Sequence, residues 1–332
     1  MHSGPHNNRQ SHMNHADRNR SADLARNVAI ALRFKKSQGT KEMPQVEREV
    51  LAPNYNRARG GNFHLASNAR EQGFPEPGMY LRKAFPDRVD IIEQVIAEGE
   101  RVGLLFRVTA THTGNFFGIP PTGRRIDVYE IAFLRIVNGQ MVEGWFMMDE
   151  VALLQQLGVK MPPRKDGRIV APPLTNTGEE PDAVVQRLQS NAPAMQHERN
   201  KIIAARSKSS SASDDYRAAD YAQLRYGFQH LRDYGARRGV AAQTLNAALP
   251  DRHDRIDVLI AEGDQVWMRF NVNGTHQASL YGLPPTGRRV GVPEAAILRF
   301  ENGQWKSSWY FGDELGLLLQ LGAPNLLLDK PA

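Results

Sequence analysis

Two stretches of this 332-residue chain repeat each other without a gap. Residues 86–158 align with residues 250–322 at a constant offset of 164, and 37 of the 73 aligned positions are identical. A repeat of this length is a whole domain, because solenoid repeats span only about 20 to 50 residues. The sequence therefore predicts two tandem copies of one small domain, called copy 1 and copy 2 below.

The segments outside the repeat set the domain boundaries. Residues 1–20 are polar and rich in His, Asn and Arg, so we expect a disordered tail. Residues 159–180 are rich in Pro, Gly and basic residues, which is typical of a linker. Copy 1 is then expected to span 21–158 and copy 2 to span 181–325.

Composition excludes several kinds of site. The chain has no cysteine, which excludes disulfides and thiolate chemistry, and no paired-His spacing supports a metal site. No apolar run is long enough to cross a bilayer, and the N-terminus does not resemble a secretory signal. The net charge is +6, but Arg and Lys form no stripe interleaved with aromatic residues, which argues against nucleic acid. These patterns predict a cytoplasmic protein without metal, membrane or nucleic-acid partner.

The clearest secondary-structure signal is a long alternating strand. Residues 101–112 alternate apolar and polar side chains, with Phe106 and His112 on the apolar face. Copy 2 repeats this pattern, with Phe270 and His276 in the same places. A half-buried antiparallel strand is predicted, with a histidine at one end of its apolar face.

A second strand, 125–137, carries a glutamate in the middle of its more apolar face, at Glu130 in copy 1 and Glu294 in copy 2. A carboxylate on a buried face must be paired, protonated or functional. Asn138-Gly139 then predicts a hairpin turn.

The third strand places an aromatic residue and an acid on one side. Trp145, Met147 and Asp149 share this side in copy 1. Their counterparts in copy 2 are Trp309, Phe311 and Asp313. Asp149 leads into a short helix that ends at Gly158. With helix-compatible residues at 21–51, 181–206 and 214–235, each copy is predicted to be an α+β domain: helices, a curved antiparallel sheet of about four strands, and a terminal helix.

The string from Thr111 to Arg125, THTGNFFGIPPTGRR, is followed by Trp145, Asp149 and the stretch LLQQLG. Together they resemble the SnoaL-like polyketide cyclase (ester cyclase) family. The resemblance covers about 60–158 and 226–322. It implies the cone-shaped α+β barrel of the ketosteroid isomerase and nuclear transport factor type, with a deep pocket.

The resemblance also implies an activity. Members of the family close a ring of an aromatic polyketide by intramolecular aldol condensation, without metal or organic cofactor. Their catalytic aspartate falls on Asp149 and Asp313, and their pocket histidine falls on His112 and His276. A buried carboxylate can act as general base, and a histidine can donate to the enolate oxygen.

Several residues are expected to line the pocket. The cyclases resembled have a second histidine two residues before the aspartate, where this chain has Met147 and Phe311. The substrate-binding candidates are Trp145, Trp309, Glu130, Glu294, Met147, Phe311, Phe106 and Phe270. Each class has a structural alternative: the aspartates as helix N-caps, the histidines as strand-closing hydrogen-bond partners, and the tryptophans as core.

The sequence thus predicts a cofactor-independent cyclase or isomerase that uses Asp as general base on a small hydrophobic carbonyl compound. The alternatives are a non-catalytic binding protein for a small hydrophobic molecule, and a hydrolase on the same fold. Because single-domain relatives commonly pack sheet against sheet, we expect an intrachain pseudo-dimer, with further homo-oligomerisation left open.

Overall fold

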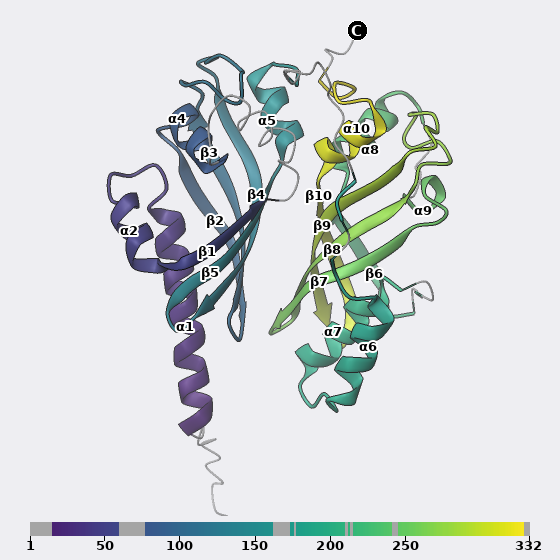
Figure 1. The fold of residues 1–332 in the computed structure, drawn as a ribbon. Coiled ribbons are helices and arrows are strands. Elements are labelled where there is room, and N and C mark those ends of the chain that lie inside the picture. Colours follow the sequence, from purple (N-terminus) through teal and green to yellow (C-terminus); the bar gives the residue numbers. More distant parts are fainter. Residues whose placement is uncertain are drawn as a thin grey trace, which may run out of the picture.

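The computed structural model describes residues 15–59, 77–161, 173–175, 177–209, 212, 215–240 and 245–328. Within these ranges the chain forms two α+β domains of the same kind (Figure 1). Most of the expected tail, 1–20, and of the expected linker, 159–180, lies outside the described residues. Helix α1 begins at His15, however, so the end of the expected tail is helical.

Copy 1 has a five-stranded sheet in the order β1-β5-β4-β3-β2. Its elements are α1 (His15–Lys36), α2 (Met43–Val50), β1 (Leu51–Arg59), α4 (Pro77–Ala84), β2 (Val89–Glu98), β3 (Arg101–Thr111), β4 (Arg125–Val137), β5 (Gln140–Met148) and α5 (Glu150–Leu157). The strands β2 to β5 form the predicted antiparallel meander. Strand β1, which the sequence pattern does not predict, adds an edge strand parallel to β5.

Copy 2 repeats this order as β6-β10-β9-β8-β7. Its elements are α6 (Pro181–Ser190), α7 (Gln196–Arg206), β6 (Arg217–Arg225), α8 (Gln229–Arg237), α9 (Leu245–Ala248), β7 (His253–Glu262), β8 (Gln265–Thr275), β9 (Arg289–Glu301), β10 (Gln304–Gly312) and α10 (Glu314–Leu321). The helix predicted for 214–235 is wrong in its first part, which forms the edge strand β6 parallel to β10.

Local chemistry explains the elements that were predicted. Asn138 and Gly139 both have positive φ, at 51° and 81°, as a tight hairpin between β4 and β5 requires. Asp149 caps helix α5 by accepting from the Ala152 N–H at 3.0 Å. Gly158 ends the same helix in the left-handed conformation. The N-cap alternative for the aspartate is therefore observed.

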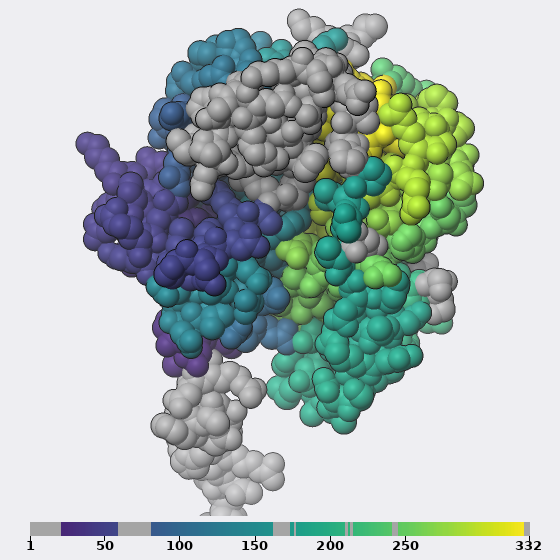
Figure 2. All heavy atoms as spheres, viewed as in Figure 1, coloured from purple at the N-terminus to yellow at the C-terminus, as the bar shows by residue number. Residues whose placement is uncertain are grey.

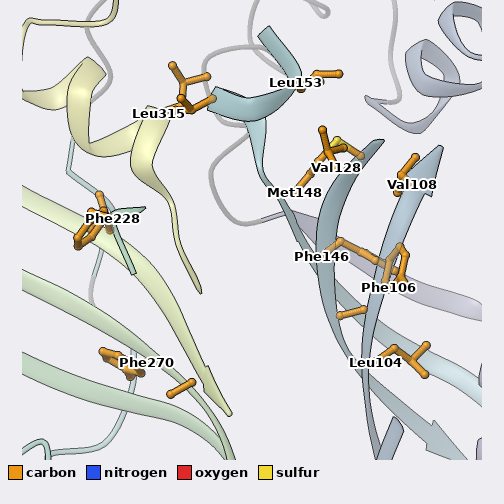
Figure 3. Close-up of a cluster of buried hydrophobic side chains, with 14 of the residues drawn as sticks. Leu104, Phe106, Val108, Val128, Phe146, Met148, Leu153, Phe228, Phe270 and Leu315 are labelled. Atoms are coloured by element: carbon orange, nitrogen blue, oxygen red, sulfur yellow. The ribbon is translucent and has the colours of Figure 1, made fainter. Parts of the chain in front are cut away.

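The concave face of each sheet is closed by helices. In copy 1, α1 covers this face, and the side chains of Leu104, Phe106 and Phe146 gather on it (Figure 3). This arrangement makes a cone whose interior lies between sheet and helices.

The convex faces of the two sheets pack against each other, and the atoms of the two halves meet along this junction (Figure 2). The contact is reciprocal: Glu262 accepts from the Ala97 N–H and Glu98 from the Ala261 N–H, both at 2.9 Å. Such an exchange is typical of a two-fold interface. Trp267 fills the space beside Gly103, where a Cβ would lie 2.8 Å from the indole. The two copies therefore lie sheet against sheet within one chain.

Candidate functional site

The predicted pair His112 and Asp149 does not lie together. The His112 N–H donates to the carbonyl of Arg124, whereas the Asp149 N–H donates to that of Tyr129. These acceptors are five residues apart, about 16 Å at the rise of an extended strand. Copy 2 has the same two bonds. The His276 N–H donates to the carbonyl of Arg288, and the Asp313 N–H donates to that of Pro293. The structure thus does not bring histidine and aspartate into one site.

His112 holds the PPTGRR loop against the end of β3. Its Nδ1 accepts from the Thr122 N–H at 3.2 Å, and its carbonyl accepts from the Gly123 N–H at 2.9 Å. His276 makes the matching bonds in copy 2 with Thr286 and Gly287. The strand-closing alternative for both histidines is therefore observed.

The other ring nitrogen is a buried donor. Nε2 of His112 and of His276 has no hydrogen-bond partner among the described residues. Because a threonine N–H occupies Nδ1, the neutral ring carries its proton on Nε2. Burial lowers the pKa of both histidines, against a smaller opposing contribution from the backbone of Gly114 or Ala278. Each histidine therefore presents a neutral N–H on the inner face of its cone.

Asp149 faces copy 2 and not the interior of its own cone. Its carboxylate accepts from Arg225 at 2.9 Å and from Nε2 of His230 at 3.0 Å, in addition to capping α5. Burial opposes ionisation, but the bond from His230 and the charges of His230 and Arg225 hold the pKa of Asp149 below its usual range. Because side chains of copy 2 bind Asp149, this carboxylate is not placed to act on a molecule in the cone of copy 1, and the role expected of it is not supported.

Asp313 occupies the same place in copy 2 with different chemistry. Its Oδ1 caps α10 by accepting from the Gly316 N–H at 2.8 Å. Burial raises the pKa of Asp313 to about 7, with only that N–H opposing the change. In the described part of the chain no cation pairs with this carboxyl.

The fold corrects the positions predicted for the two tryptophans and for Met147 and Phe311. Trp145, Met147, Trp309 and Phe311 all belong to the apolar cluster between the two sheets. The alternation of β5 and β10 places them on the convex face, opposite Phe146, and the other copy covers that face. They therefore do not line a cone.

Glu130 and Phe106, by contrast, lie inside the cone of copy 1, where Glu130 belongs to a buried group of four charged side chains. Arg88 donates to Asp90 at 2.7 Å and to Glu130 at 2.8 Å. Lys35, from α1, places Nζ 2.7 Å from Asp90 and 3.8 Å from the centroid of the Phe106 ring. We call Lys35, Arg88, Asp90 and Glu130 the charged quartet of copy 1.

Copy 2 contains a matching quartet, composed of Lys208, Arg252, Asp254 and Glu294. Arg252 lies 2.7 Å from Asp254, and the Lys208 Nζ lies 3.7 Å from the centroid of the Phe270 ring. A further nitrogen of Arg252 donates to the side chain of Asn246 and not to Glu294. Burial accordingly raises the pKa of Glu294, although Lys208 and Arg252 oppose the change.

The two quartet lysines have unusual acidity. Burial lowers the pKa of Lys35 to about 8, with Asp90 opposing the change. Burial likewise lowers the pKa of Lys208 to about 8, against Asp254 and Glu294. Both lysines therefore lose their protons within two units of neutral pH.

A cavity in copy 1 is lined by one member of the quartet, Arg88. It lies between the turn after α1, helices α2 and α4, and the edge strand β1. Its main lining residues are Gln38, Met43, Arg57, Leu81, Phe85 and Arg88. Arg88 is thus both a cavity wall and the centre of the quartet, while Phe85 lies between the cavity and the His112 ring, 5.2 Å away. No group of three or more potential metal ligands occurs among the described residues.

Lys35, Arg88 and Asp90 are not among the site residues predicted from the sequence. The recurrence of Arg88-x-Asp90 as Arg252-x-Asp254 was a usable signal, because both residues are identical in the two copies. The lysines could not be found this way. Lys35 lies in α1 and Lys208 just after α7, both outside the stretch that aligns without gaps.

The comparisons with known proteins agree with this architecture. A family model described as SnoaL-like polyketide cyclase matches residues 61–157 and 210–321. The two matches cover more than half of the chain, which therefore belongs to the SnoaL-like polyketide cyclase family as a tandem duplication. No described helix has the length and apolarity that a membrane span needs.

Individual relatives match a single domain. Aklanonic acid methyl ester cyclase DauD of Streptomyces sp. (strain C5) is 27% identical over 152 residues, which are 46% of this chain and 89% of that protein. A protein of Jannaschia sp. CCS1, described as a SnoaL-like polyketide cyclase, is 25% identical, with a TM-score of 0.35, over 42% of this chain and 95% of its own. AclR of Streptomyces galilaeus, described as a hydroxylase, is 28% identical, with a TM-score of 0.34, over 43% of this chain and 87% of its own.

Proposed function

We propose that this protein is a cofactor-independent cyclase-type enzyme that acts on a small, carbonyl-rich, polyketide-like substrate in the cone of copy 1. The observation that carries the proposal is the cavity of copy 1, whose lining includes Arg88, the residue that donates to the buried carboxylate of Glu130. The family membership and the relative named as an aklanonic acid methyl ester cyclase support the class of substrate.

A contribution to stability does not by itself explain why the chain has the charged quartet. Buried ion pairs are often no more stabilising than apolar residues of similar volume, because desolvation offsets the attraction. Nevertheless the arginine, aspartate and glutamate occur in both copies, although nearly half of the aligned positions differ. Retention of a costly group beside a cavity supports a role in binding or catalysis.

The chemistry follows from the charges. Glu130 takes a proton from a carbon that lies between two carbonyl groups of the substrate, and the electron pair of that C–H bond becomes an enolate. The positive charges of Arg88 and Lys35 stabilise the enolate oxygen in an apolar site. The enolate carbon then bonds to a second carbonyl carbon of the same molecule. The resulting alkoxide recovers the proton from Glu130, so the closed ring is an isomer of the substrate.

Glu130 replaces Asp149 as the proposed base because of what each carboxylate faces. Glu130 lies on the inner face and is joined to a cavity residue, whereas Asp149 is held by Arg225 and His230 of copy 2. The Nε2–H of His112, behind Phe85, would be a further donor for a substrate carbonyl.

The proposal is tested with an aromatic β-diketone probe in D2O. Wild-type protein is expected to speed deuterium incorporation at the carbon between the carbonyls, or ring closure, relative to buffer, as measured by mass spectrometry. Binding of the probe without exchange or cyclisation would support the non-catalytic binding protein instead. Cleavage of an ester analogue alone would support the hydrolase.

Turnover is also expected to depend on pH through Lys35. As the pH rises through about 8, Lys35 loses the charge that stabilises the enolate, so the rate should fall on the alkaline side. Lys35→Arg should retain activity at higher pH, since guanidinium stays protonated throughout this range. Lys208→Arg is the matched control, and a pH–rate profile measures both. An alkaline limb that persists in Lys35→Arg but disappears in Lys208→Arg would assign the reaction to copy 2.

A further inference from the structure

A second cavity lies where the two copies meet, away from both quartets. It is bounded by helix α5 of copy 1, helix α8 of copy 2 and the segment that follows α10. Three arginines line it, Arg124, Arg237 and Arg238, and no acidic residue does. Leucines from α5 and from the segment 326–328 supply an apolar wall. We propose that this junctional groove binds a small amphipathic carboxylate, with its head on the arginines and its apolar body on the leucines.

Contacts between the two copies hold the wall of the groove in place. The side-chain amide of Gln155 donates to the carbonyl of Leu327 at 2.8 Å. The Met161 N–H donates to the side chain of Asn325 at 3.1 Å. The two bonds attach the segment after α10 to α5 and to the residues that follow α5, so the docking of the copies holds Leu326, Leu327 and Leu328 in the wall.

The three arginines bring positive charge to the groove. The Arg238 guanidinium stacks on the Tyr234 ring, 3.5 Å from its centroid, which fixes its plane. Arg124 lies against Gly158 at the C-terminal end of α5, where a Cβ would be 2.1 Å from its nitrogen. Arg237, in the last turn of α8, is exposed and has no ion-pair partner among the described residues. Arginine forks bind carboxylates with paired, charge-assisted hydrogen bonds, so a carboxylate head matches this surface.

The apolar wall selects the rest of the ligand. A small hydrophilic anion would leave the leucines uncovered, whereas an alkyl or aryl body buries them and gains about 25 cal/mol per Å² of apolar area. Because the ligand would touch both copies, its binding should stabilise their docking. The proposal is independent of the reaction assigned to the cone of copy 1.

Decanoate, decanol and acetate are the probes, titrated against the full chain by calorimetry below their aggregation concentrations. Decanoate should bind at least tenfold more tightly than either of the others and should raise the melting temperature. Arg237→Gln combined with Arg238→Gln should weaken decanoate by about ten- to a hundredfold. Arg299→Gln, an exposed arginine outside the groove, is the matched control and should change nothing.

A further variant separates the groove from the cone. Leu81→Trp narrows the copy 1 cavity and should leave decanoate affinity unchanged. If Leu81→Trp abolishes binding while the double arginine variant retains it, decanoate occupies the cone and the proposal is wrong. Equal affinities for decanol and decanoate, or no binding by decanoate, would also overturn it.

Discussion

Glu130→Gln is expected to reduce turnover of the β-diketone probe by about 10²- to 10⁴-fold, the usual contribution of a general base. Glutamine has the size of glutamate, and its carbonyl oxygen can still accept from Arg88, so the quartet should keep its shape. What it lacks is the ability to take a proton. Binding of the probe should therefore change far less than turnover, and single-turnover measurements of exchange would separate the two.

Glu294→Gln is the matched control, because it makes the same change in the quartet of copy 2. The interior of copy 2 carries larger side chains, with Trp305 where copy 1 has Met141 and Tyr310 where it has Phe146. Trp305 is buried and packs edge-on against Tyr221, 5.3 Å between centroids. We therefore expect most turnover to survive Glu294→Gln. Loss of turnover in Glu294→Gln but not in Glu130→Gln would place the reaction in copy 2, and retention in both would exclude the quartets as the source of the base.

Much of the fold could be predicted because local and repeated signals agreed. The gapless repeat identified the duplication, alternation identified β3 and β4, and the Asp–Gly pair at positions 149 and 158 bounded α5. The edge strands β1 and β6 were missed for a physical reason. Their residues are largely polar and partly exposed, so they lack the apolar alternation that marks a half-buried strand.

The site was predicted less well because alternation reveals two faces but not which of them is concave. On β5, Trp145 and Phe146 point to opposite sides, and either could have faced a pocket. The docking of copy 2 decides this question, since it buries the Trp145 face. A second difficulty is a register shift between Arg135 and Ile136, which the sequence does not reveal. In a regular strand Met141 and Trp145 would lie on the same face, but the shift places Met141 on the inner face.

The contacts of Asp149 with Arg225 and His230 are also not predictable from the sequence alone. Both aspartates precede similar helices that begin with Glu, and both act as N-caps, as the sequence suggested. Only the tertiary structure reveals that Arg225 and His230 of copy 2 bind the carboxylate of Asp149 in copy 1. One motif therefore yields two carboxyls with pKa values displaced in opposite directions.

Asp149→Asn and Asp313→Asn are accordingly expected to change stability with opposite signs at pH 8. Asparagine caps a helix about as well as aspartate, so the cap itself should contribute little to either result. Asp149→Asn leaves the Arg225 guanidinium and His230 without their counter-charge, and breaking a buried pair costs about 3–5 kcal/mol. Asp313→Asn removes a buried carboxylate whose ionisation opposes folding, and should stabilise the protein by about 2–4 kcal/mol.

The pH dependence distinguishes these effects from general changes in packing. The pKa of Asp313 is raised on folding, so the folded state loses stability relative to the unfolded chain as pH rises from about 4 to about 7. The advantage of Asp313→Asn should therefore be small at pH 4.5 and grow until about pH 7. The pKa of Asp149 is lowered on folding, so its contribution is present above about pH 4 and is lost as the pH falls through the folded-state value. Denaturation midpoints of both variants and the wild type at about pH 3, 4.5, 6 and 8 measure both effects. Equal destabilisation by the two substitutions at pH 8 would mean that Asp313, like Asp149, is ionised and paired in the folded protein.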